Sequence, residues 1–307
     1  MKISVQSAGV VDYVGYEKGY EMIRKAGFTA IDWNALDHAL KPAQIREFRY
    51  AGNIYERPIE EVYAHFAAEV AEIRKNGLTI TQGHAPFPAY VPGHPELLDY
   101  MIEVYKKVIL LCDHYACKNL VIHGISLAIT DKENTPDTVK QLNMKLYSSL
   151  IPTLLKCNVT VCLENLFTWD GCACHAVCSD PQEAVAYIDE LNALAGKEVF
   201  GFCLDTGHAA LLGRDFRCIV PVLGKRIKCL HVHDNDGRVD RHLAPMTGKL
   251  NWNYFCDSLR DIGYDCDLNF ETFAQTTKAY EFSEQLLMPW LQLLASIGLA
   301  FRDRILN

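Results

Sequence analysis

Four side chains of metal-binding type each come directly after a short apolar run of the sequence. Glu164 follows residues 159–163, Asp205 follows 199–204, His231 follows 227–230 and Glu271 follows 267–270. Three carboxylates gathered without a cation would repel one another and retain protons at neutral pH. A divalent ion removes that conflict, and three carboxylates with one imidazole suit Mn²⁺ or Zn²⁺, with Mg²⁺ and Co²⁺ as alternatives. If the four runs are neighbouring strands, these side chains are expected to hold such an ion.

A second group of imidazoles and carboxylates lies close to these four in the sequence pattern. His84 and His123 end two earlier apolar runs, His208 stands three residues after Asp205, and Asp240 and His242 lie in the segment after His231. These five are interpreted either as additional metal ligands or as hydrogen-bonded residues at the surface or behind the ligands, and His84 and His123 also as substrate contacts. His233 follows His231 by two residues and would point the same way along a continued strand, so it is expected either to bind the metal or to contact substrate or support the ligands.

The apolar runs that would position these side chains are short and rich in β-branched residues. There are eight of them, at residues 3–5, 30–33, 78–81, 119–122, 159–163, 199–204, 227–230 and 267–270. Stretches with helical spacing lie between them or close the chain, at residues 16–26, 59–75, 95–115, 134–156, 180–195, 253–262 and 280–301. The alternation predicts a (β/α)₈ TIM barrel, eight parallel strands with outer helices, whose active site lies at the C-terminal strand ends.

The sequence lacks the motif expected of the main alternative fold. No G-x-G-x-x-G follows the first run, so a dinucleotide-binding doubly wound sheet lacks its main support. The segments 35–58 and 235–251 are long for connections in a barrel and are expected to contact substrate. No linker or composition break divides the chain, which predicts one domain spanning residues 1–307.

Composition and net charge indicate which binding partners to expect. Half of the residues are hydrophobic and the formal net charge is −8, so no nucleic-acid partner is expected. The sequence starts without a signal-peptide pattern and holds no spanning apolar stretch, which predicts a cytoplasmic protein without a membrane partner. The 12 cysteines are therefore expected to be thiols, and those in the cysteine-rich segment 171–178 to be incidental residues of a loop. A second copy of the chain, in a homo-oligomer, is a further candidate partner.

Several motifs resemble those of the xylose isomerase-like barrels. They are Leu163-Glu164-Asn165, residues 204–208, residues 231–236, Asn269-Phe270-Glu271-Thr272 and the segment 240–252. This family includes sugar phosphate isomerases and epimerases, ketose 3-epimerases, inosose dehydratases and AP endonucleases of the endonuclease IV type. The resemblance covers most of the chain and implies the barrel fold and the four metal ligands named above.

The resemblance also implies a chemistry. In the ketose isomerases and epimerases of the family, the first and last ligating glutamates transfer protons, so Glu164 and Glu271 are the expected catalytic carboxylates. His208 would hydrogen-bond a substrate oxygen. The expected reaction is isomerisation or epimerisation of a small sugar or polyol through a metal-stabilised enediolate. A lyase or dehydratase of the same family starts with the same proton abstraction and stays open as an alternative.

The resemblance to the endonuclease branch suggests a third candidate function. Nine residues match its trizinc ligand set position by position: His84, His123, Glu164, Asp205, His208, His231, Asp240, His242 and Glu271. The Asp240-x-His242 pair is the feature that favours the endonuclease branch, since ketose 3-epimerases lack it. The acidic charge and the lack of basic loops with interleaved aromatic residues favour the sugar enzyme. A barrel that only binds its ligand is disfavoured by the intact pair Glu164 and Glu271.

The expected substrate contacts are aromatic and imidazole side chains near the strand ends. They are Trp33, His84, His123, His233 and Trp169. Apolar sugar faces stack on aromatic rings while polar groups read the hydroxyls. The segment Ala244-Pro245-Met246-Thr247-Gly248 departs from the family's usual Pro-Pro-Gly-Glu-Gly and lacks its carboxylate, which leaves the identity of the substrate open. Because no glycine-rich phosphate cradle follows the last two runs, an unphosphorylated sugar or polyol is favoured.

Overall fold

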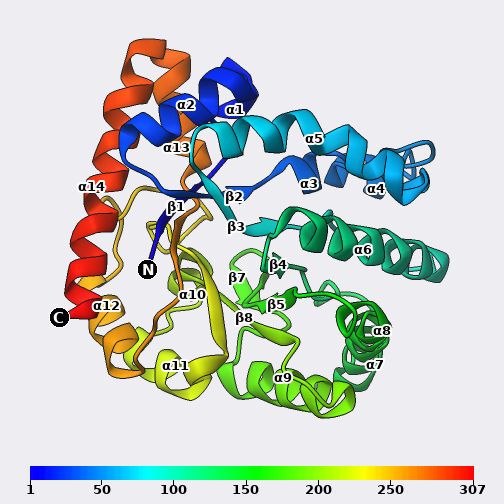
Figure 1. The fold of residues 1–307 in the computed structure, drawn as a ribbon. Coiled ribbons are helices and arrows are strands. Elements are labelled where there is room, and N and C mark those ends of the chain that lie inside the picture. Colours follow the sequence, from blue (N-terminus) through cyan, green and yellow to red (C-terminus); the bar gives the residue numbers. More distant parts are fainter. The chain divides into compact units, whose positions relative to one another are not determined.

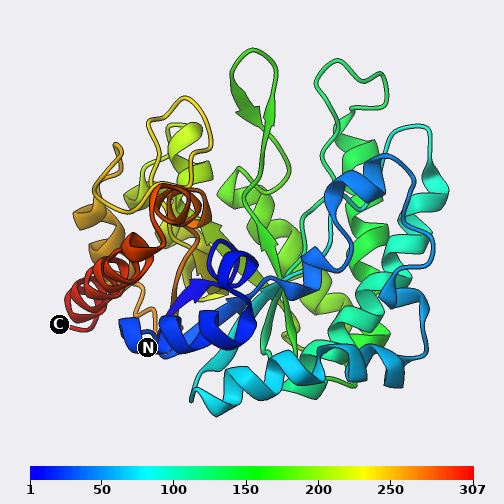
Figure 2. The ribbon, with the colours of Figure 1, turned by 90° about the horizontal axis from the view of Figure 1, so that it is seen from above.

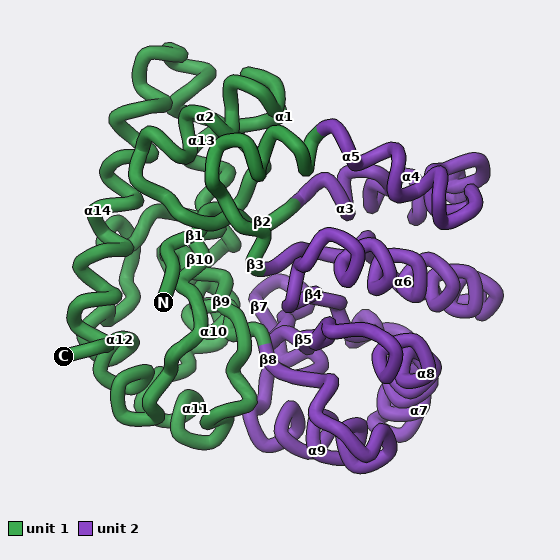
Figure 3. Tube along the Cα trace, in the orientation of Figure 1, with its two compact units in different colours: residues 1–33, 69–81, 203–307 green, residues 34–68, 82–202 purple.

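The computed structural model describes residues 1–307 throughout, and the chain divides into two compact units (Figure 3). Unit 1 consists of residues 1–33, 69–81 and 203–307, and unit 2 consists of residues 34–68 and 82–202. The boundaries fall inside two strands, β3 (Thr79–His84) and β8 (Phe200–Asp205), so each of these strands has residues in both units. That the whole chain forms one domain stays a prediction.

Unit 1 contains four complete strands in addition to parts of β3 and β8. They are β1 (Ile3–Gln6), β2 (Ala30–Trp33), β9 (Ile227–His231) and β10 (Leu268–Phe270). Strand β1 runs parallel to both of its neighbours, and Val5 pairs with Ile31 of β2 on one side and with Phe270 of β10 on the other. All residues of β1 and β2 are buried, as expected for a parallel sheet covered on both faces.

Unit 2 contains two further strands of the same parallel kind and a separate hairpin. Strand β4 (Asn119–Val121) runs parallel to β3 and to β5 (Thr160–Glu164), with Leu120 opposite Gly83 and Val161. The hairpin is formed by β6 (Phe167–Trp169) and β7 (Ala173–His175), which are antiparallel (Figure 2). It follows β5 directly, so the chain turns away immediately after Glu164.

The order of the hydrogen-bonded strands is that of a (β/α)₈ barrel. The order is β10-β1-β2-β3-β4-β5-β8-β9, and a parallel bridge between Val232 and Phe270 joins β9 to β10. The chain therefore returns to its first strand through its last, with helical segments between successive strands. The predicted fold class is confirmed.

Some helices of unit 1 lie in segments that the sequence predicts to be helical, and others do not. They are α1 (Val11–Val14), α2 (Tyr16–Ala26), α10 (Thr206–Leu211), α11 (Phe216–Leu223), α12 (Trp252–Asp261), α13 (Phe273–Phe282) and α14 (Leu287–Leu306), with the 3₁₀ helices η2 (Gly224–Arg226) and η3 (Glu284–Leu286). Gly27 ends α2 in the left-handed conformation that the sequence suggests for it. The long α14 lies beside α2 and α12 (Figure 1), and Trp252 stacks on Phe301 across the α12–α14 contact.

Most helices of unit 2 have a proline at the first or second helical position. They are α3 (Ala35–His38), α4 (Pro42–Arg46), α6 (Pro95–Tyr115), α7 (Pro136–Ser148), α8 (Ile151–Leu154) and α9 (Pro181–Ala195), with the 3₁₀ helix η1 (Ile54–Glu56), while α5 (Ile59–Lys75) has residues in both units. Helix α9 is an example of a capped N-terminus. Asp180 accepts hydrogen bonds from the amides of Gln182 and Glu183, and Pro181 takes the first helical position. None of the chain's helices is both long and apolar enough to cross a membrane.

The structure adds elements that the sequence pattern does not predict. The hairpin β6–β7 occupies part of the segment interpreted as a loop, and α10 and α11 fill the connection between β8 and β9. The expected helix 134–156 is two helices, α7 and α8, and the closing segment is α13, η3 and α14. The segment 35–58 contains α3, α4 and η1.

Candidate metal centre

Asp205 is the last residue of β8 and has no exposed surface. Its Oδ1 accepts a hydrogen bond of 2.7 Å from the amide of His208 and so caps α10. Its Oδ2 accepts a second hydrogen bond, of 2.9 Å, from Nε2 of His233. Both oxygens are therefore held in place by the first turn of a helix and by a buried imidazole.

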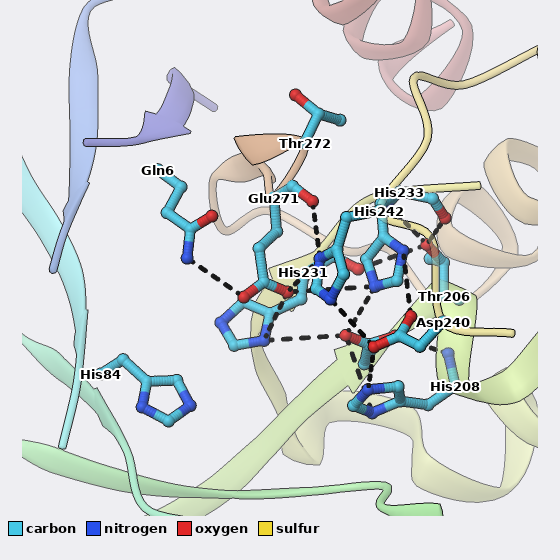
Figure 4. Close-up of polar contacts among 12 residues, drawn as sticks. Gln6, His84, Thr206, His208, His231, His233, Asp240, His242, Glu271 and Thr272 are labelled. Carbon is cyan, nitrogen blue, oxygen red and sulfur yellow. Dashed lines mark hydrogen bonds and ion pairs between the residues drawn. The ribbon is translucent and has the colours of Figure 1, made fainter. Parts of the chain in front are cut away.

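His231 and Glu271 lie at the neighbouring strand ends of unit 1, and both are buried. Nδ1 of His231 lies 3.5 Å from Oε2 of Glu271 and 3.9 Å from Oδ2 of Asp205. Gln6, at the end of β1, donates a hydrogen bond of 3.2 Å to Oε1 of Glu271 (Figure 4). Unit 1 thus brings together three of the four residues predicted to hold a metal.

Asp32 supports this arrangement and is a residue that the sequence analysis misses. Its Oδ2 lies 3.6 Å from Nε2 of His231 and accepts a hydrogen bond of 3.0 Å from Asn269. A carboxylate beside a ring nitrogen favours a hydrogen on that nitrogen, and Nδ1 of His231 is then the atom that faces Glu271 and Asp205. The only signal in the sequence is one charged residue inside an apolar strand.

His233 and His242 stack face to face in unit 1, with ring centroids 4.1 Å apart and an interplanar angle of 14°. The backbone of His233 is fastened on both sides by Thr206, whose hydroxyl donates to the His233 carbonyl (2.6 Å) and accepts from the His233 amide (2.9 Å). Gly207 leaves the space for the ring, because a Cβ there would lie 1.9 Å from Cε1 of His233.

Asp240 and His242 enter the cluster from the segment that follows β9. Nε2 of His242 donates to Oδ2 of Asp240 (2.9 Å), and Nε2 of His208 lies 3.5 Å from the same oxygen. Burial opposes ionisation of Asp240, but the hydrogen bonds from His208 and His242 outweigh it and hold the pKa of Asp240 well below its usual range. Burial also favours the neutral His242 ring, yet the charges of Glu271 and Asp240 raise the pKa of His242 to about 9. The predicted additional ligands His208, Asp240 and His242 therefore form one connected group.

The segment that carries Asp240 and His242 is anchored in large part by the buried carboxylate of Asp234. It accepts hydrogen bonds from the amides of Met246 and Leu250 and from the indole of Trp252, each 3.0–3.1 Å long. Gly248 is required beside it, because a Cβ there would lie 2.3 Å from Oδ1 of Asp234. The start and the end of the segment are thereby drawn to one point.

Unit 2 holds a second group of ligand-type side chains. Nε2 of His123 lies 2.9 Å from Oε2 of Glu164 and 2.9 Å from Nε2 of His84. Nδ1 of His84 donates to the carbonyl of Ala85 (2.8 Å), so the Nε2 atom of this ring is the one that faces His123 and Glu164. Two imidazole nitrogens and a carboxylate oxygen thus converge as they would around a cation.

The predicted aromatic contacts lie in contrasting surroundings. Trp33 ends β2 and is fully buried, whereas Trp169 in the hairpin β6–β7 is 53% exposed. Cys172 and Cys174 belong to the same hairpin, and all 12 cysteines are free thiols. The roles assigned to these residues from the sequence stay predictions.

The atoms of unit 1 fit a divalent cation. Nδ1 of His233 and Oδ1 of Asp240 are buried acceptors without a hydrogen-bond donor, and they lie 3.9 Å apart. Burying such atoms without a partner is costly, and a cation that accepts their lone pairs relieves the cost. Burial also raises the pKa of the Glu271 carboxyl, although His231 and His242 act in the opposite direction. Mixed imidazole and carboxylate donors are typical of Zn²⁺, Mn²⁺ and Co²⁺ sites.

The chain belongs to the family of xylose isomerase-like TIM barrels, whose family model matches residues 20–292. This confirms the resemblance inferred from the strand-end motifs. The uncharacterized protein y4fM of Sinorhizobium fredii is 25% identical over 279 residues, which cover 84% of this chain and 81% of that protein.

Solved structures of sugar epimerases share the fold. D-psicose 3-epimerase of Clostridium cellulolyticum H10 has a TM-score of 0.71 at 15% identity, covering 98% of this chain and 99% of that one. An L-ribulose 3-epimerase has a TM-score of 0.70 at 16% identity, with 99% and 95% covered. The 3-keto-D-glucoside 4-epimerase YcjR of E. coli has a TM-score of 0.65 at 15% identity, with 95% and 99% covered. At these identities the likeness concerns the fold, and the reaction has to be argued from the site.

Proposed function

We propose that this protein is a divalent-metal-dependent isomerase or epimerase of a small, unphosphorylated sugar or polyol. The observation that carries the proposal is the convergence of Asp205, His231 and Glu271 at adjacent strand ends of unit 1. Membership of the xylose isomerase-like family supports it, as do the epimerase names of proteins with the same fold. Glu164, which ends β5, would be the fourth ligand.

In this proposal each residue of the site has its own role. Glu164, Asp205, His231 and Glu271 would hold the cation, which when bound supplies electrostatic stabilisation of negative charge on substrate oxygens. Glu271 would remove a proton from the carbon next to the carbonyl, and Glu164 would return a proton to complete the change. The hydrogen bond of 3.2 Å from Gln6 orients the Glu271 carboxylate, as a positioned base requires. His208 would donate a hydrogen bond to a substrate oxygen.

The test is a deuterium exchange assay. Protein loaded with Mn²⁺ is incubated in D₂O with a panel of ketoses and aldoses, and products are followed by NMR and mass spectrometry. The proposal expects a new sugar isomer that carries one solvent deuterium at the reacting carbon and has lost no water. A product lighter by one water would instead assign the lyase or dehydratase alternative. No exchange with any sugar of the panel would contradict the proposal.

One specific observation favours a second candidate, a three-metal AP endonuclease. His84, His123 and Glu164 converge in unit 2, while His208, Asp240 and His242 form a further group in unit 1. These are the groups that a trizinc site would need beyond the four principal ligands. A duplex with a single abasic site tests it: nicking by zinc-loaded protein would establish this candidate, and an intact duplex alongside sugar turnover would remove it. The acidic net charge of −8 weighs against it.

A further inference from the structure

The two ring nitrogens of His233 have different surroundings in unit 1. Its Nε2 lies 2.9 Å from Oδ2 of Asp205. A carboxylate only accepts hydrogen bonds, so Nε2 carries the hydrogen and Nδ1 is left with a bare lone pair. The side chain has no exposed surface, and its Nδ1 atom has no hydrogen-bond donor.

The imidazole of His233 is also prevented from turning away. Gly207 lies against one part of the ring, and His242 covers a face at a centroid distance of 4.1 Å. Thr206 holds the backbone through two hydrogen bonds. The direction of the Nδ1 lone pair is therefore fixed by packing, as is required of a preorganised ligand.

Oδ1 of Asp240, which is also an acceptor, lies 3.9 Å from Nδ1 of His233. That oxygen is buried and has no hydrogen-bond donor either. Two facing acceptors repel each other, and a cation that both atoms bind would remove this repulsion. With Zn–N and Zn–O bonds of about 2 Å, a tetrahedral site would place the two donors about 3.3 Å apart, so only a small approach of the two side chains is needed. An imidazole that binds metal through one nitrogen and donates its other N–H to a carboxylate is the common arrangement of metal-bound histidines.

We propose that His233 is a metal ligand through Nδ1, and that together with Asp240 it holds a second divalent cation that prefers imidazole and carboxylate donors, such as Zn²⁺ or Co²⁺. Because Nε2 of the same ring positions Asp205, a ligand of the first cation in the proposed function, His233 links the two metal positions. The inference rests on the proposed function only in this link.

Substitution of His233 separates the two tasks. His233→Gln retains an N–H donor near the position of Nε2 but provides no Nδ1 ligand, whereas His233→Leu removes both. The metal-free wild-type protein and both variants are titrated with Co²⁺, and bound cobalt is measured by visible absorption and by elemental analysis after gel filtration. His65→Gln, which removes an exposed imidazole on α5, is the matched control.

We expect His233→Gln to bind one cobalt ion fewer per chain than wild type and to keep the affinity of the remaining ions within a few-fold. His233→Leu should lose the same ion and also weaken the ion at Asp205 by about 10- to 100-fold, the usual effect of removing such a supporting group. Retention by His233→Gln of the full number of ions at wild-type affinity would overturn the inference. Should circular dichroism show this variant misfolded, Asp240→Asn tests the same pair from its other side, with the same loss expected and retention again overturning it.

The outcome for the wild-type protein separates this inference from the proposed function. If wild type binds cobalt and His233→Gln binds it equally, only the role of His233 fails. If wild type binds no cobalt at all, the metal-dependent function fails, and the inference fails with it.

Discussion

Gln6, at the end of the first strand, donates a hydrogen bond of 3.2 Å to Glu271, which directly follows the last strand, 265 residues later in the chain. The bond spans the β1–β10 pairing, where Val5 lies opposite Phe270. Glu271 is thereby oriented from one side by an amide and faces His231 on the other, at 3.5 Å. The first and last strands of the chain together place this carboxylate.

Glu271→Gln is expected to abolish proton transfer while keeping the fold. The amide has the shape of the carboxylate and still offers an oxygen to Gln6, but it cannot act as a base at neutral pH. We expect kcat to fall by about 100- to 10,000-fold, the usual contribution of a general base. Solvent deuterium incorporation and sugar turnover measure this, with the thermal midpoint as the check on folding. Glu281→Gln, an exposed carboxylate on α13, is the control, and normal exchange by Glu271→Gln would refute the assignment.

Asp234→Ala is expected to release the segment between β9 and α12. It removes the acceptor shared by the amides of Met246 and Leu250 and the indole of Trp252. Since each buried donor left without a partner costs about 1–3 kcal/mol, we expect a loss of unfolding free energy on the order of 3 kcal/mol. Denaturant unfolding measures that loss.

Limited trypsin digestion provides a local reading of the same change. Arg238 and Arg241 lie exposed within the segment, and the variant should be cut there at a protease concentration that leaves wild type intact. Asp265→Asn, which changes an exposed carboxylate outside the segment, should resist cleavage as wild type does. Equal resistance of wild type and Asp234→Ala would show that Asp234 is not the anchor.

The ion pair between α12 and α14 predicts a pH-dependent contribution to stability. Arg304 contacts both oxygens of Asp257, at 3.2 and 2.9 Å, and Arg260 contacts it at 2.9 Å. The hydrogen bonds from Arg304 hold the pKa of Asp257 below its ordinary value, although burial acts in the opposite direction. A carboxyl whose pKa is lowered by folding stabilises the protein above its unfolded pKa of about 3.9, and this stabilisation disappears as the pH falls through the folded value.

Asp257→Asn should therefore lower the thermal midpoint at pH 7, and the difference from wild type should shrink as the pH drops below about 4. Thermal unfolding over a pH series measures it, ideally at low salt, where an exposed pair is least screened. Asp265→Asn removes an exposed carboxylate from the loop after α12 and serves as the control. A difference that stays constant down to pH 2.5 would contradict this account.

Much of the fold can be predicted from the sequence because the strands of a parallel barrel are apolar on both faces. Residues 199–204 illustrate this, since the whole of β8 is buried. The helices α10 and α11 escape prediction for physical reasons. Helix α10 starts on the strand's last residue, with no linker to mark it, and α11 is short and contains Pro221, which usually ends a helix. The hairpin β6–β7 is held by only three residue pairs and carries no strong alternation.

Some residues of the candidate site can likewise be predicted from the sequence, and others cannot. Asp205, His231 and Glu271 can be found because each ends an apolar run, and the structure places them together in unit 1. The connections of His233 cannot be found, since they depend on Thr206 and Gly207 in the first turn of α10 and on how the segment after β9 folds back to bring Asp240 near. Asp32 is hidden for a similar reason, because its contact with His231 arises only when the strands are assembled. Spacing along one strand predicts position, whereas hydrogen-bond partners require the fold.

The anchoring of residues 235–250 leaves Asp240 and His242 on a segment and not on a strand. Asp234 and Gly248 hold the two ends of that segment together within unit 1. Replacing Asp240 or His242 therefore changes the donor set of the cluster and leaves every strand of unit 1 in place.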